Sequence, residues 1–209
     1  TRGSSCHDSR RMDDKDKANP LPGAADAPTV LILPGWLNSD ASHWQSRWEA
    51  LYGDQRVQQH DWMQPLRGDW MMQLEEAVLA APPGPIVLAA HSLGCLLTAA
   101  WAEHSRNTHR VVGALLVAPG DAEREEFRAP LKSWSPIVMQ RLPFASTLLG
   151  SHDDPYCTFA RAQQLANAWG STFVDYGNKG HINADSGLGD WPEGRALLAP
   201  FLNTKKADV

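Results

Sequence analysis

The stretch that decides the fold runs from Pro85 to Leu97 and reads PIVLAAHSLGCLL. An apolar run, residues 85–90, is followed by His91 and Ser92 and then by a second apolar run, with no turn sequence between them. The first run predicts a buried strand, and the second has apolar residues at the spacing of a helix. The sequence therefore predicts a strand that passes directly into a helix. A serine at that junction is either a packed hydroxyl or a nucleophile.

Outward from this junction, the chain from Thr29 onward alternates short apolar runs with longer segments of helical periodicity. This alternation predicts an α/β fold, with a parallel sheet of about six strands and helices on both faces. The predicted strands are 29–33, 56–62, 85–90, 111–118, 144–150 and 172–176. The predicted helices are 40–53, 68–81, 93–105, 158–170 and 192–202. Residues 119–143, charged and interrupted by proline, are expected to form a surface excursion with one short helix.

Helix ends are marked by a few residues. Asp40 and Asp69 are expected to be N-caps, because their carboxylates can accept hydrogen bonds from the free N–H groups of a first turn. Gly53 and Gly170 are expected to end the helices that they follow.

Composition limits the possible partners. The 209 residues are 43% hydrophobic, which is enough for one domain with its own core. The net charge of −5 and the scattered Lys and Arg residues disfavour nucleic acid and anionic membranes as partners. No apolar run is long enough to span a bilayer. Three widely spaced cysteines without a CxxC motif favour a reducing compartment, so we expect a cytoplasmic protein.

The first residues have a different composition. Residues 1–28 are rich in small, charged, Pro and Gly residues, so we expect a disordered tail there and a folded domain over 29–209. Met12 is either the biological start or a residue within a native tail, and the sequence leaves both open.

The strand–helix junction has a recognisable pattern. Ala90, Ser92 and Gly94 form AxSxG, one methyl group away from the GxSxG nucleophile elbow. Small residues on both sides are needed because the sharp turn brings the neighbouring strand and helix close. Such a turn would lift the Ser92 hydroxyl above the sheet at a helix N-terminus, where N–H groups stabilise a developing oxyanion.

A serine nucleophile needs a base and an acid later in the chain. His181 lies in a glycine-flanked loop after the last predicted strand and is the expected base. Asp153 and Asp154 follow the fifth predicted strand, and only one of two adjacent side chains can orient the histidine. We favour Asp154 because Pro155 holds it outside the helical region, but the sequence leaves Asp153 open. A metal site of His152, these aspartates and His181 is disfavoured, since it lacks zinc-ligand spacing.

The positions of other residues predict an oxyanion hole and the rim of a substrate site. Gly35 comes directly after the first strand, so the backbone N–H of Trp36 is expected to join that of Leu93 in an oxyanion hole. A shallow substrate site is expected, rimmed by some of four aromatic side chains: Trp36, Trp134, Tyr156 and Trp191. Most of the nine tryptophans, including Trp44, Trp48 and Trp101, are expected instead to pack helices onto the sheet.

The motifs PGW, HWQSRW, AHSLG, GSHDDP and GH carry a resemblance over residues 29–203. The sequence resembles the α/β-hydrolase superfamily, and within it the small serine hydrolases typified by retinoblastoma-binding protein nine and YdeN. The resemblance implies an α/β-hydrolase fold, a Ser92–Asp154–His181 triad and an oxyanion hole at Trp36 and Leu93. Ala90 replaces the first glycine of the usual elbow.

This resemblance implies a serine hydrolase with an acyl-enzyme intermediate and neither metal nor cofactor. Because residues 119–143 are too few for a large lid, we expect a carboxylesterase for a small-molecule ester with a short acyl chain. Two alternatives stay open: an amidase, peptidase or thioesterase with the same triad, or a binding protein that retains the fold. The physiological substrate, the oligomeric state and any protein partner are not determined by the sequence.

Overall fold

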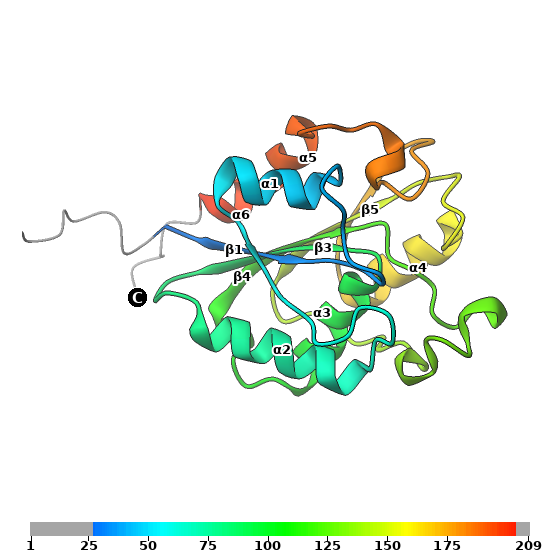
Figure 1. Ribbon diagram of the computed structural model, residues 1–209, viewed down its shortest axis with the longest axis horizontal. Coiled ribbons are helices and arrows are strands. Elements are labelled where there is room, and N and C mark those ends of the chain that lie inside the picture. The colour runs from blue at the N-terminus through cyan, green and yellow to red at the C-terminus, as the bar shows by residue number, and fades with distance from the viewer. Residues whose placement is uncertain (1–26, 204–209) are drawn as a thin grey trace, which may run out of the picture.

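The computed structural model describes residues 27–203, which form an open sheet of six parallel strands (Figure 1). The strands are β1 (Thr29–Leu33), β2 (Gln55–Arg56), β3 (Ile86–His91), β4 (Val111–Val117), β5 (Ala145–Gly150) and β6 (Thr172–Asp175). Their spatial order is β2-β1-β3-β4-β5-β6, and every neighbouring pair is parallel. The α/β-hydrolase fold class predicted from the sequence is confirmed.

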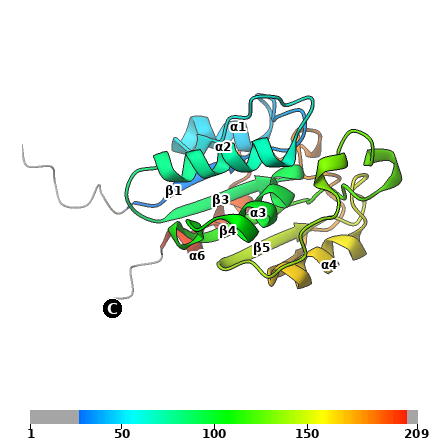
Figure 2. The same ribbon diagram turned by 90° about the horizontal axis from the view of Figure 1, so that it is seen from below.

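Helices cover both faces of the sheet, as Figures 1 and 2 show. One face carries α2 (Arg67–Ala80), α3 (Leu93–His104) and α4 (Phe159–Trp169), and the other carries α1 (Trp44–Tyr52), α5 (Pro192–Ala196) and α6 (Ala199–Leu202). Each face has its own apolar cluster. Trp70, Trp101 and Trp169 lie in the first cluster, and Trp44 and Trp48 in the second, so these tryptophans pack helices onto the sheet as expected.

Strand β2 is shorter than predicted. It pairs only with β1, through Leu31 with Gln55 and Ile32 with Arg56. Since β1 ends one residue later, at Leu33, residues beyond Val57 have no strand beside them. The predicted strand over 56–62 was therefore wrong beyond its first residue, Arg56.

Both predicted N-caps were wrong. The side chain of His43 caps α1, and Asp40 instead accepts hydrogen bonds from Ser42 and His43 in the preceding turn. Asp69 lies in the first turn of α2, inside the helix rather than at its cap. Gly53 and Gly170 do end α1 and α4, both with a left-handed backbone (φ 70° and 71°).

The closing helix and the excursion also differ from expectation. The predicted helix over 192–202 is divided into α5 and α6, because Pro200 has no N–H to donate within a continuous helix. Residues 119–143 contain two short 3-10 turns, Glu125–Phe127 and Lys132–Trp134, rather than one helix. No large lid is present among the described residues.

Parts of the sequence-based predictions fall outside this structure. The predicted disordered tail, with Met12, lies almost entirely outside the described residues. Within the described residues, Cys95 and Cys157 are buried free thiols, and no helix is long and apolar enough to cross a membrane.

Candidate active site

The strand register brings distant loops to one edge of the sheet. Leu33 lies beside Ala90, His91 beside Val117, and Val117 beside Leu149, so β1, β3, β4 and β5 end level with one another. In parallel sheets, loops that leave the carboxyl ends of strands build sites at this edge. The loops after β1, β3, β5 and β6 therefore converge, and these loops carry the residues singled out in the sequence.

Ser92 stands alone between β3 and α3 in a strained backbone conformation. Its φ and ψ are 54° and −118°, a region that non-glycine residues rarely adopt. The turn is held on both sides: the N–H of Ser92 donates to the carbonyl of Val117, and its own carbonyl accepts from Cys95. This is the geometry of a nucleophile elbow, and the Ser92 side chain lines a pocket.

Close backbone approach explains the small residues around Ser92. A Cβ atom on Gly94 would lie 2.3 Å from the carbonyl oxygen of Leu33, and one on Gly35 would lie 2.8 Å from the Cβ of Ser92. Ala90 replaces the usual first glycine, and its methyl group is fully buried in the core on the α2 and α3 face. The elbow thus requires glycine at 94 but accepts alanine at 90.

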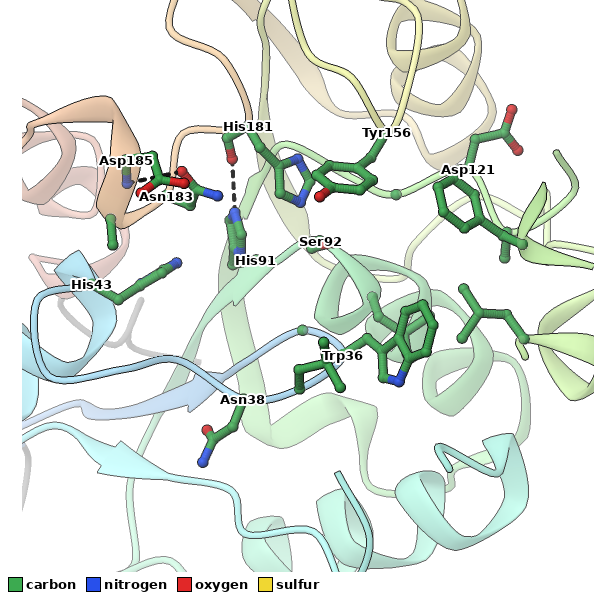
Figure 3. A pocket seen from close by; sticks show the side chains of 18 of the residues that line it. Trp36, Asn38, His43, His91, Ser92, Asp121, Tyr156, His181, Asn183 and Asp185 are labelled. Carbon is green, nitrogen blue, oxygen red and sulfur yellow. Dashed lines mark hydrogen bonds between the residues drawn. The ribbon is translucent and has the colours of Figure 1, made fainter. Parts of the chain in front are cut away.

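His181 is held by Asp154. Its Nδ1 lies 3.0 and 2.9 Å from the two carboxylate oxygens, and both side chains are buried. The same carboxylate accepts the backbone N–H of Tyr156 at 2.8 Å, which fixes its orientation. Because a carboxylate only accepts hydrogen bonds, the Nδ1 of His181 is the protonated nitrogen, and Nε2 keeps a free lone pair. His181 and Ser92 line the same pocket (Figure 3).

Asp153 points elsewhere. Its carboxylate accepts the N–H of Gly180 at 2.8 Å and the hydroxyl of Ser151 at 2.9 Å. These hydrogen bonds, that from Gly180 above all, lower the pKa of Asp153. Asp153 therefore braces the loop that carries His181, and the geometry assigns contact with the imidazole to Asp154.

His91 is a site residue that the sequence reasoning missed. Its Nε2 donates to the backbone carbonyl of His181 across 2.8 Å, and the two rings lie 4.7 Å apart. Burial holds the pKa of His91 well below its usual value, so the ring is neutral. The available signal was its place in the sequence, since a histidine at the end of a buried strand needs a polar partner.

His43 continues this row of rings, and it too was missed. Its centroid lies 4.7 Å from that of His91 in an edge-on arrangement. Burial lowers its pKa to about 4, so it is neutral at physiological pH. His43, His91 and His181 thus form a row beside Ser92 (Figure 3).

The expected oxyanion hole has suitable geometry. Trp36 and Leu93 both line the pocket with Ser92. Neither of their N–H groups takes part in the turn and loop hydrogen bonds of residues 27–203. Gly35 leaves room for the close approach, since a Cβ there would lie 3.4 Å from the nitrogen of Leu93. Two backbone donors are therefore available next to the serine.

The pocket encloses about 300 Å³, at the small end for ligand sites. Trp36 and Tyr156 line it as predicted, with Phe127 and Leu131 from the excursion. Within residues 27–203, no group of three His, Cys, Asp or Glu side chains is arranged to hold a metal ion.

Two predicted rim residues lie in the core instead. Trp134 is buried against Trp70, with its Nε1 donating to the carbonyl of Pro65 at 2.8 Å. Trp191 is buried in a stack with Trp48 on the other face of the sheet. The large apolar area of each indole is better buried under a helix or turn than at a rim, and sequence position alone does not distinguish the two.

Fold and site together define a serine hydrolase with the α/β-hydrolase fold. The chain belongs to the family described as Serine hydrolase, whose model matches residues 30–200.

Solved structures agree with this assignment. The chain is similar to a protein of Pectobacterium atrosepticum described as a YdeN-like hydrolase, with 34% identity and a TM-score of 0.73 over 84% of this chain and 90% of that one. It is also similar in fold to the ydeN gene product of Bacillus subtilis (20% identity, TM-score 0.67, 85% and 100% covered). Esterase 2 of Thermogutta terrifontis shares the fold at 17% identity, with a TM-score of 0.60 over 87% of each chain. A comparison with curated proteins finds no match.

Proposed function

We propose that this serine hydrolase is a carboxylesterase for small esters with short acyl chains, acting through Ser92, His181 and Asp154. The observation that supports it best is the contact of His181 Nδ1 with both oxygens of Asp154, at 3.0 and 2.9 Å, in the pocket that Ser92 lines. This contact leaves Nε2 as the base for a serine hydroxyl.

The proposed reaction has two halves. Ser92 Oγ attacks the ester carbonyl while His181 Nε2 takes its proton, and the N–H groups of Trp36 and Leu93 stabilise the oxyanion. The protonated His181 then gives the proton to the leaving alcohol, which leaves an acyl group on Ser92. Water, deprotonated by His181, attacks the acyl-enzyme and releases the acid. Asp154 holds the imidazolium during both halves.

The small pocket supports the short acyl chain. Its walls include Phe127, from one short 3-10 turn, and Leu131, which directly precedes the other, rather than residues of a lid domain. A long chain would leave this pocket and extend into water.

The test is labelling with a fluorophosphonate probe, followed by turnover of butyrate presented as an ester, a thioester and an amide. Wild type should be labelled and should prefer the ester. Ser92→Ala should lose labelling and lose turnover by several orders of magnitude, because triad members act as a unit. Labelling that survives in Ser92→Ala would contradict the nucleophile assignment, and a preference for thioester or amide would contradict the carboxylesterase.

A further inference from the structure

The pocket has two chemically different ends on either side of Ser92 (Figure 3). Trp36 and Tyr156 lie at one end (Figure 3), where Phe127 packs against Tyr156 and adds apolar surface, and the carboxylate of Asp121 at this end pairs with Arg161. At the other end lie the polar side chains of His43, Asn183 and Asp185 (Figure 3), and Asp40, which also lines the pocket, accepts the backbone N–H of His43. The proposed esterase uses the first end for an apolar group and leaves the second without a role.

His43 holds an unpaired donor at this polar end. Its Nδ1 accepts the backbone N–H of Gln45 at 3.1 Å, as the N-cap of α1, so the neutral ring carries its proton on Nε2. The residue is only 5% exposed, and Nε2 is buried without a hydrogen-bond partner among the described residues. A buried donor without an acceptor is costly, and such groups normally have a partner.

The charges around His43 limit the chemical class of the group that can accept its Nε2–H. Asp40 and Asp185 line the same end, and no Lys or Arg of the described residues lines the pocket. Hydrogen bonds, that from the Ser42 hydroxyl above all, lower the pKa of Asp40 and keep it ionised. An anionic group would be repelled by these carboxylates, and an ammonium group has no lone pair for the N–H of His43. An alkyl group would leave that N–H unpaired.

We propose that this polar end is a subsite for a neutral hydroxyl group of the substrate. The hydroxyl oxygen accepts the Nε2–H of His43 and donates its own proton to a carboxylate of the same end. This assignment rests on the proposed esterase function and adds the chemical class of the ester: one part is small and apolar, and the other carries a hydroxyl. His43 is then a specificity-determining residue that acts through direct contact.

Two matched substrate pairs test the subsite and locate the hydroxyl. Hydroxyethyl butyrate and propyl butyrate differ only at the end of the alcohol, and ethyl β-hydroxybutyrate and ethyl isovalerate differ only at the β-carbon of the acyl group. Wild type should favour the hydroxylated member of one pair by about tenfold in kcat/KM, the value of one neutral hydrogen bond. Which pair discriminates shows whether the hydroxyl belongs to the alcohol or to the acyl part.

His43→Asn is the informative variant, because asparagine keeps an N-cap acceptor for α1 but does not reach as far as Nε2. In this variant, the ratio of kcat/KM for the hydroxylated ester to kcat/KM for its matched partner should fall to about one. His60→Asn replaces an exposed histidine that does not line the pocket and should keep the wild-type ratio.

The outcomes separate the two proposals. Hydrolysis of all four esters without discrimination would overturn the subsite and leave the esterase function standing. Discrimination that survives in His43→Asn would overturn the role of His43. Hydrolysis of none of the esters would overturn both.

Discussion

Asp154 contacts His181 with both carboxylate oxygens, whereas the adjacent Asp153 contacts the backbone of Gly180, one residue before that histidine. Two neighbouring acids thus hold one loop in different ways. Asp154 orients the imidazole ring, and Asp153 and Ser151 hold the loop backbone. In the proposed mechanism, catalysis is therefore expected to depend on Asp154 far more than on Asp153.

Asp154→Asn should lower kcat by about 10⁴, because an amide leaves His181 in the wrong tautomer. Asp153→Asn should cost about tenfold or less, since it weakens only the hydrogen bonds that hold the loop backbone and leaves the contact between Asp154 and His181 in place. Steady-state kinetics of both variants with one short-chain ester measure this difference. The opposite ranking would make Asp153 the acid.

Chain-length specificity should follow from the shallow pocket. With fixed leaving group, kcat/KM should peak at acyl chains of about two to six carbons, because further methylenes stay in water and gain little of the roughly 0.8 kcal/mol that burial gives each. An ester series from acetate to palmitate, kept below micelle concentrations, measures the profile. A steady rise through the long chains would reveal a buried acyl tunnel and favour a lipase or thioesterase.

The elbow should not tolerate a side chain at Gly94. Gly94→Ala puts a methyl group 2.3 Å from the backbone oxygen of Leu33, so we expect a loss of about 1–3 kcal/mol of unfolding free energy, or more. Gly68→Ala is the matched control. It lies in α2 with no atom within 4 Å of the added Cβ, so it should gain about 0.4–1 kcal/mol. Urea unfolding of both variants distinguishes them, and equal stabilities would contradict the close approach at the elbow.

Stability should fall in mild acid because of His43. Burial depresses its folded pKa from 6.5 to about 4; nearby Asp40 opposes this shift, and His181 and Arg56 add to it. The unfolded state therefore binds the proton first as the pH falls. The part of the unfolding free energy that depends on neutral His43 is fully present above pH 6.5. It is lost as the pH falls towards 4, by about 3 kcal/mol in all.

Urea unfolding between pH 7 and pH 4.5 measures this slope. His43→Asn should flatten it, although the buried and neutral His91 still contributes a slope of the same sign. An equal slope in wild type and variant would show that His43 does not carry it.

Local patterns determined the fold class and most of the proposed triad. The apolar run that ends at His91, followed at once by a helical run, defines a strand–helix junction, and the small residues around Ser92 identify an elbow. The position of His181 after the last strand was enough to predict a base, since parallel strands bring their carboxyl ends to one edge. These features depend on residues that are close in the sequence or on the place of a residue directly after a strand. They can therefore be predicted from the sequence.

Tertiary structure decided what depends on packing between distant segments. The contact of His181 with Asp154 rather than Asp153 depends on how the loops after β5 and β6 meet, whereas the sequence favoured Asp154 only through the adjacent Pro155 and left Asp153 open. Trp134 and Trp191 belong to the core because Trp70 and Trp48 lie beside them, and periodicity does not record such contacts. The sequence alone thus fixes which residues stand at the ends of strands, whereas three-dimensional packing fixes which of those side chains meet.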